Sequence, residues 1–84
     1  RAQIDTIDQN LLDTLGKRMN VAVEIGALKK SNNVAVLQNK RWNEILGKMI
    51  LEGQERELSE EFILRVFKAI HQESINKQEK ILNA

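Results

Sequence analysis

The first thirty or so residues constrain the fold most, because they have the pattern of one unbroken helix. We predict this helix over residues 2–31, since the pattern ends only at Ser31-Asn32-Asn33. Such a helix would be roughly 45 Å long at about 1.5 Å per residue. A compact globule of this chain length has a radius of gyration of only about 12–13 Å, so the helix would overshoot its own domain. We therefore expect a second copy of the chain to cover it, in a two-fold homodimer. The apolar residues at helical spacing are Ile4, Ile7, Leu11, Leu15, Ala22 and Ile25.

The remainder of the chain also favours helices, because it contains no proline. A second helix is predicted from near Leu37 to near Gly53, where the glycine would act as a stop signal. A third is predicted from the N-cap residue Ser59 to about Leu82. We expect an all-α fold of three helices in a single domain over residues 1–84. The apolar faces would comprise Trp42, Ile45, Leu46 and Met49 in the second helix and Ile63, Phe67, Ile70 and Ile81 in the third.

The composition argues against several classes of function. Thirteen basic and twelve acidic residues give a net charge of +1, without the basic footprint of a nucleic-acid binder. No run of apolar residues is long enough to span a membrane, and we find no secretory signal pattern. Cysteine is absent, so we expect no disulfide, no thiolate metal site, no cofactor and a cytoplasmic location. The chain begins with Arg1 and not methionine, which is typical of a processed chain or an excised domain.

The functional signal lies in polar residues placed on apolar stripes. Arg18 and Lys29 lie eleven residues apart on the stripe of the first helix, about 16 Å apart along its axis. Ser74 and Gln78 lie one turn apart on the stripe of the third helix, and Arg41 lies at the margin of the second. Burying cations without partners is costly, and these stripes hold few carboxylates. The pattern predicts an internal pocket for a small anion with at least two negative groups.

Each of these residues also has an ordinary structural explanation. A lone arginine on an apolar stripe is often salt-bridged or extends its charged end to water. A lone serine or glutamine in a helix usually bonds its own backbone. His71, on the same side of the third helix, is more often a core or rim histidine than a functional one. Only the combination on three separate helices favours a pocket.

In order and spacing, these residues resemble the all-helical (type II) chorismate mutases over nearly the whole chain. No single motif is specific, and the match depends on their order. The residues that carry it are Arg1, Ile4, Ile7, Asp8, Leu11, Leu12, Leu15, Arg18, Val21, Ala22, Glu24, Ile25, Gly26, Lys29, Arg41, Phe67, Ile70, Ser74 and Gln78.

The resemblance implies an intertwined homodimer that rearranges chorismate to prephenate in aromatic amino acid biosynthesis. It implies that Arg18 and Arg41 bind the substrate carboxylates and that Ser74 helps to hold the ring carboxylate. It also implies that Lys29 and Gln78 are catalytic and contact the ether oxygen. The chemistry suits these residue types, since a concerted rearrangement within one molecule needs positioning and electrostatic stabilisation but no nucleophile or metal.

Arg1 is expected to reach the site of the partner subunit. It lies seventeen residues before Arg18, roughly 26 Å along a straight helix, so one small molecule cannot touch both in one chain. Either Arg1 has no role or it serves the partner's site.

Two positions depart from the family pattern. Gln38 and Trp42 stand where the best-known members carry acidic residues that orient the substrate and bind its ring hydroxyl. Gln38 can still bind substrate through its amide oxygen, whereas an indole only donates, so we interpret Trp42 as a core residue. The family pattern leads us to expect an aliphatic residue at the position of His71. The imidazole of His71 would give the site a pH dependence near neutrality.

Two alternatives remain open from the sequence. An isochorismate pyruvate lyase on the same fold would take nearly the same dianion, although Ser74 favours the mutase. A non-enzymatic helical dimerisation or regulatory module would explain the long first helix but not the polar residues on the stripes. Some bacterial members of the family are fused to a 3-deoxy-heptulosonate 7-phosphate synthase, and we expect such a partner domain here.

Overall fold

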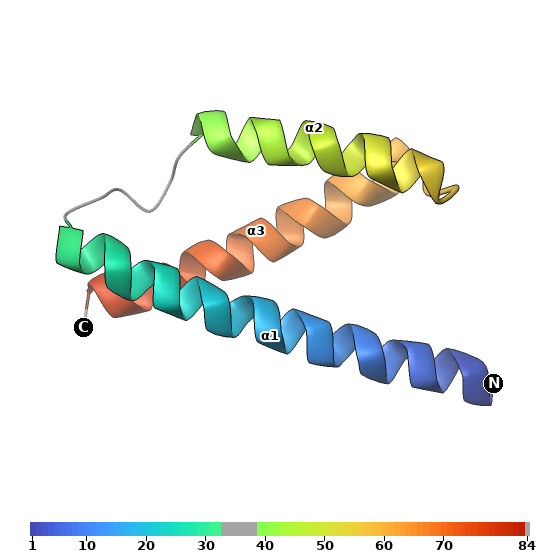
Figure 1. The fold of residues 1–84 in the computed structure, drawn as a ribbon, viewed down its shortest axis with the longest axis horizontal. Helices are drawn as coiled ribbons and strands as arrows, with labels where there is room; N and C mark the ends of the chain where they lie inside the picture. Colours follow the sequence, from blue (N-terminus) through green and yellow to red (C-terminus); the bar gives the residue numbers. More distant parts are fainter. Residues whose placement is uncertain (33–38, 84) are drawn as a thin grey trace.

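The computed structural model describes residues 1–32 and 39–83, which form three helices. They are α1 (Ala2–Asn32), α2 (Asn39–Glu55) and α3 (Glu60–Leu82), and no strand occurs within the described ranges (Figure 1). The all-α prediction is confirmed, with α1 and α3 bounded within one residue of the predicted limits. The predicted start of the second helix near Leu37 lies outside the described residues.

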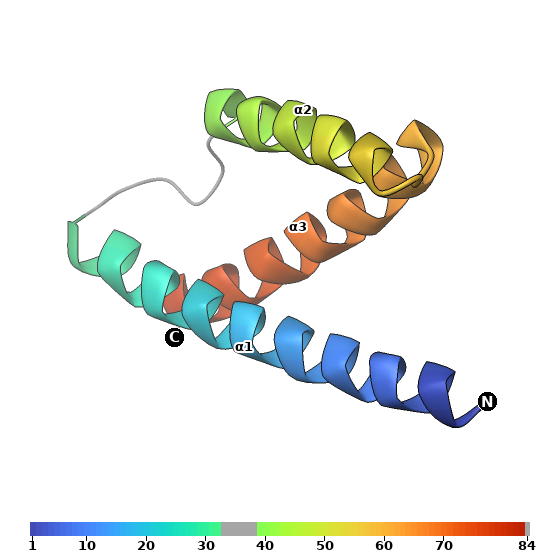
Figure 2. The same cartoon turned by 45° about the vertical axis from the view of Figure 1, so that its right-hand side comes forward.

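The three helices form an open wedge with α3 as its spine (Figures 1 and 2). Cα atoms of α3 come within 8 Å of both α1 and α2, whereas no such approach joins α1 to α2 in the described part of the chain. The N-terminal half of α1 projects beyond the other helices. The molecule measures 44 × 28 × 14 Å, and its radius of gyration of 14.7 Å exceeds that of a compact globule. Within the described residues, α1 and α2 are therefore joined through α3 and leave a slot between them.

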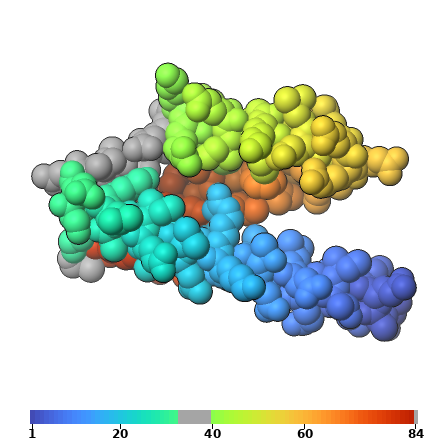
Figure 3. Space-filling model, viewed as in Figure 1, coloured from blue at the N-terminus to red at the C-terminus, as the bar shows by residue number. Residues whose placement is uncertain are grey.

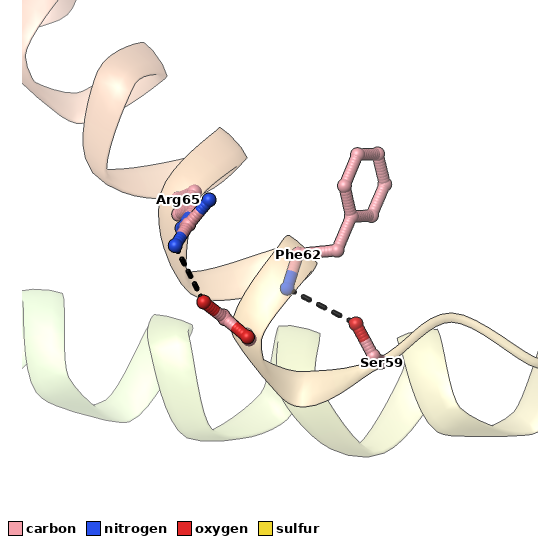
Figure 4. A network of polar contacts seen from close by, with 4 residues as sticks. Ser59, Phe62 and Arg65 are labelled. Carbon is pink, nitrogen blue, oxygen red and sulfur yellow. Dashed lines mark hydrogen bonds and ion pairs between the residues drawn. The ribbon is translucent and has the colours of Figure 1, made fainter.

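The start of α3 is fixed by a side-chain cap. Ser59 has extended backbone angles, and its hydroxyl accepts a hydrogen bond from the backbone N–H of Phe62 at 3.2 Å (Figure 4). Glu60 and Glu61 follow in the first turn, where the helix dipole favours negative charge. Glu61 also pairs with Arg65 one turn later. The predicted N-cap is confirmed, and α3 begins where the sequence places it.

The helix α2 ends at Glu55, two residues after Gly53, near which its end is predicted. The chain then turns through Glu57, whose φ of 61° is left-handed, and the backbone N–H of Leu58 donates to the carbonyl of Gly53 at 2.9 Å. Gly53 has a packing role instead. A Cβ there would lie 2.6 Å from Cγ1 of Ile63, so only glycine lets α3 fold back this closely.

A second close approach joins α1 to α3. A Cβ on Gly26 would lie 3.1 Å from the Cα of Gln78, and Ala22, one turn earlier, is buried. Small residues at these two positions bring the backbone of α3 close to that of α1. This contact holds Gln78 beside the inner face of α1.

The N-terminal half of α1 leaves its apolar residues uncovered. Ile4 and Ile7 are each 63% exposed, and Leu11 and Leu12 are exposed as well. A row of exposed aliphatic side chains on a projecting helix is typical of a surface that another chain covers. Among the described helices, none is both long and apolar enough to cross a membrane.

The two glycines of α2 provide a matched test of this packing. Gly53→Ala should destabilise the fold by about 1–2 kcal/mol, because its methyl group collides with the buried Ile63. Gly47→Ala meets nothing within 4 Å and should stabilise the helix by up to about 1 kcal/mol. Urea unfolding at one fixed protein concentration measures both. Equal stabilisation by the two substitutions would contradict the close approach.

Candidate active site

The candidate site is an open cavity of about 510 Å³ between the three helices. It lies in the slot that α1 and α2 leave between them, with α3 behind (Figure 3). Every helix contributes to its wall. The lining residues are Arg18, Val21, Ala22, Ile25 and Lys29 from α1, Arg41, Trp42 and Ile45 from α2, and His71, Ser74, Ile75 and Gln78 from α3.

Five of the seven predicted site residues come together in this cavity, namely Arg18, Lys29, Arg41, Ser74 and Gln78. They come from three helices and span 61 positions of sequence (18 to 78), so the fold alone makes them neighbours.

The other two predicted site residues are not among the lining. Arg1 is exposed at the projecting end of α1, far from the cavity within the same chain (Figure 1). Gln38 lies outside the described residues. A contribution of Arg1 therefore requires a second chain.

The Arg18 guanidinium is oriented by α3. Its Nη1 donates to Oγ of Ser74 at 2.6 Å, and that hydroxyl in turn donates to the backbone carbonyl of Ile70 at 3.0 Å. Ser74 is only 6% exposed, so the contact lies inside the wedge. A guanidinium has five N–H donors in a fixed fork, so donors remain for a carboxylate. Ser74 thus orients the side chain of Arg18 through this hydrogen bond.

The cavity wall is cationic. Arg18, Lys29 and Arg41 line it, and no aspartate or glutamate is among the lining residues. Burial, followed by the charge of Arg41, lowers the pKa of Lys29 below its ordinary value. The cost of holding these charges together would be relieved by a bound dianion, which favours their charged forms.

Gln78 brings an unused polar group to the same wall. It is 7% exposed, and its Oε1 is buried without a hydrogen-bond partner among the described residues. Leaving such a group unpaired costs about 1–3 kcal/mol. Rotation of the terminal amide exchanges its oxygen and nitrogen, so the position can accept or donate a hydrogen bond. A ligand with an ether or carbonyl oxygen would use the N–H.

Trp42 and His71 form a stacked pair across α2 and α3 that the sequence did not reveal. Their ring centroids are 3.9 Å apart and their planes differ by 9°. Trp42 is half-buried and lines the cavity, so it packs against His71 and also faces the site. The available sequence signal was position: Trp42 follows Arg41, and His71 is three residues before Ser74.

The imidazole of His71 is held neutral by its surroundings. Burial is the main cause that lowers its pKa below 6.5, and the charges of Arg18 and Lys29 lower it further. The surroundings of His71 therefore disfavour its charged imidazolium form. Within the described residues, no group of three or more histidine, cysteine, aspartate or glutamate side chains could hold a metal ion.

The described residues thus form a small all-α wedge around a cationic cavity, with no aspartate or glutamate among the described lining residues. The chain belongs to the chorismate mutase type II family, whose model matches residues 1–79.

Relatives agree with this family over the whole chain. A bifunctional chorismate mutase/prephenate dehydratase of Buchnera aphidicola from Acyrthosiphon pisum is 33% identical over 98% of this chain and 21% of its own length. The Escherichia coli K12 protein of that name is 30% identical over 98% of this chain and 21% of its own. A 4-amino-4-deoxychorismate mutase of Streptomyces venezuelae is 24% identical over 99% of this chain and 81% of its own.

The chain spans about a fifth of the length of the bifunctional relatives. Their names pair the mutase with a prephenate dehydratase, and not with the 3-deoxy-heptulosonate 7-phosphate synthase expected from the sequence. The expected synthase partner therefore has no support among them.

Trp42 and His71 are the only tryptophan and histidine of the chain, so one fluorescence titration reports on both. A protonated imidazole quenches a stacked indole. Tryptophan emission should therefore decrease as the pH is lowered, with a midpoint below pH 6.5. The unfolded chain takes up this proton first as pH falls, so the free energy of unfolding should decrease below pH 6.5 and level off below the folded pKa. His71→Gln should remove the transition. A midpoint above 6.5 would contradict a desolvated, cation-flanked imidazole.

Proposed function

We propose that this domain catalyses the rearrangement of chorismate to prephenate inside the cavity. The observation that carries the proposal is the convergence of Arg18, Lys29, Arg41 and Gln78 on one cavity wall free of carboxylates. Chorismate has two carboxylates and one ether oxygen, which match two arginines, one ammonium and one amide. We further propose that residues 1–84 form a single domain and that it acts in the cytoplasm.

The arginines supply positioning. Arg18, oriented by Ser74, and Arg41 come from opposite sides of the slot and would each bind one carboxylate. Arginine–carboxylate forks fix both distance and angle. Held in this way, the enolpyruvyl side chain lies over the ring in its compact reactive conformer, and the entropy of reaching that conformer is lost on binding.

Lys29 and Gln78 supply transition-state stabilisation. As the ether C–O bond breaks and the new C–C bond forms, negative charge grows on the ether oxygen. An ammonium and an amide N–H directed at that oxygen bind it more strongly in the transition state than in the substrate. The substrate dianion also favours protonated Lys29, which offsets the lowering of its pKa by burial and Arg41.

Lys29→Met and Gln78→Leu should each lower kcat/KM for chorismate by about 100-fold or more, the usual cost of one such donor. Lys17→Met is the matched control: it removes the same charge from the exposed side of the same helix and should change turnover less than about twofold. The assay follows loss of chorismate and formation of prephenate. Release of pyruvate from isochorismate, without prephenate formation, would assign the lyase activity instead.

We propose that the active form is a homodimer in which Arg1 completes the partner's site. The exposed row from Ile4 to Leu12 needs a cover, and Arg1 lies beyond reach of its own cavity. A second copy satisfies both requirements in one symmetric contact.

Mixing two impaired variants tests the shared site. Arg1→Ala and Arg18→Ala should each lower turnover by about 100-fold. After subunit exchange in a 1:1 mixture, half of the dimers are mixed and each has one complete site, so activity should recover to about a quarter of wild type. Absence of recovery, with exchange verified by mass spectrometry, would show that Arg1 does not act across the dimer.

A further inference from the structure

His71 offers a polar atom that the proposed mechanism does not use. Its Nε2 is buried and has no hydrogen-bond partner within the described ranges, while its ring lines the cavity. Ser74 lies three residues further along α3 and Gln78 seven, so all three residues share the face turned to the cavity. A buried imidazole nitrogen left unpaired is costly unless a ligand satisfies it.

Trp42 sets the orientation of the imidazole ring that carries this nitrogen. The indole covers one face of the imidazole at a centroid separation of 3.9 Å with nearly parallel planes, so rotation of the His71 ring is blocked. The pair also links α2 to α3. A hydrogen bond to Nε2 must lie near the plane of the imidazole, and the stack with Trp42 sets that plane.

The charges around His71 determine which ligand groups its Nε2 atom can bind. Arg18, Lys29 and Arg41 line the same cavity, and its wall holds no acid. The imidazole stays neutral there, since burial and the nearby cations lower its pKa. A neutral imidazole either donates or accepts through Nε2, and a hydroxyl can do both. The described lining residues include no aspartate or glutamate that could pair with an ammonium in the same place.

We propose that His71, held by Trp42, binds the ring hydroxyl of chorismate and makes the site select a hydroxyl-bearing ring over an amino-bearing one. This inference rests on the proposed function, because the carboxylates and the ether oxygen of the substrate are already assigned to other residues. The hydroxyl is the remaining polar group of chorismate. His71 is thus a specificity-determining residue, and Trp42 is its positioning residue.

The test compares three substrates: chorismate, an analogue that lacks the ring hydroxyl, and 4-amino-4-deoxychorismate. Wild type should convert chorismate with kcat/KM about tenfold above the deoxy analogue, the worth of one buried hydrogen bond. It should disfavour the amino compound by a larger factor. His71→Leu should bring the ratio of kcat/KM for chorismate to kcat/KM for the deoxy analogue close to one. The kcat/KM for the deoxy analogue itself should change little.

Further variants separate hydrogen bonding from packing. His71→Gln restores a donor and an acceptor and should regain part of the ratio, and Trp42→Phe should keep more of it than Trp42→Leu. Gln72→Leu, at the next and exposed position of α3, is the matched control and should leave all rates unchanged. A purely structural role for His71 would lower the rates with both substrates equally and leave their ratio at the wild-type value.

The outcomes distinguish this inference from the proposed function. Wild type that converts chorismate but shows no preference for the hydroxyl overturns the role of His71 alone, and this measurement needs no variant to fold. A ratio unchanged in a folded His71→Leu, verified by circular dichroism, overturns it equally. Wild type that converts none of the three substrates overturns the proposed function, and the inference with it.

Discussion

The central electrostatic constraint on this molecule is that three cations line one cavity, with no aspartate or glutamate among the described lining residues. Arg18 and Lys29 stand on α1 and Arg41 on α2, and only α3 holds these two helices in one body. Clustering like charges in a partly buried space opposes folding. The guanidinium of Arg18 is held in place by its hydrogen bond to Ser74. That preorganisation is how such a site lowers a barrier without a nucleophile or a metal.

Two close helix contacts maintain this arrangement. Gly53 lets α3 fold back on α2, and Gly26 lets it approach α1, so two residues without side chains set both sides of the wedge. Gln78 is carried to the cavity by the second of these contacts. A chain of this size buries only a small core, and here the slot stays open and the apolar residues in the N-terminal half of α1 stay exposed.

Helical periodicity and capping made most of the fold predictable. The unbroken stripe gave the extent of α1, and Ser59 gave the start of α3, because both depend on local interactions. The end of α2 was not predictable in the same way. Gly53 has the composition of a stop signal but serves a contact with Ile63, ten residues away, and the left-handed turn falls instead on Glu57. Tertiary contact overrode local preference there.

The cavity could be predicted from the sequence only at positions where a polar residue lies on an apolar helix face. Arg18, Lys29 and Gln78 stood out because they broke an apolar stripe. Trp42 did not, since an aromatic residue on an apolar face looks like core, and its stacking with His71 depends on a crossing of α2 and α3 that no local pattern encodes. The arrangement of this wall is therefore information that only the three-dimensional structure supplies.

The most direct test of the account is a crystal structure with an oxabicyclic dicarboxylate that mimics the transition state of the rearrangement. The account predicts that the dianion occupies the cavity, with one carboxylate bound by Arg18, the other by Arg41, and its ether oxygen within hydrogen-bond distance of Lys29 and Gln78. A dianion bound outside the cavity, or bound there without contact to either arginine, would contradict it.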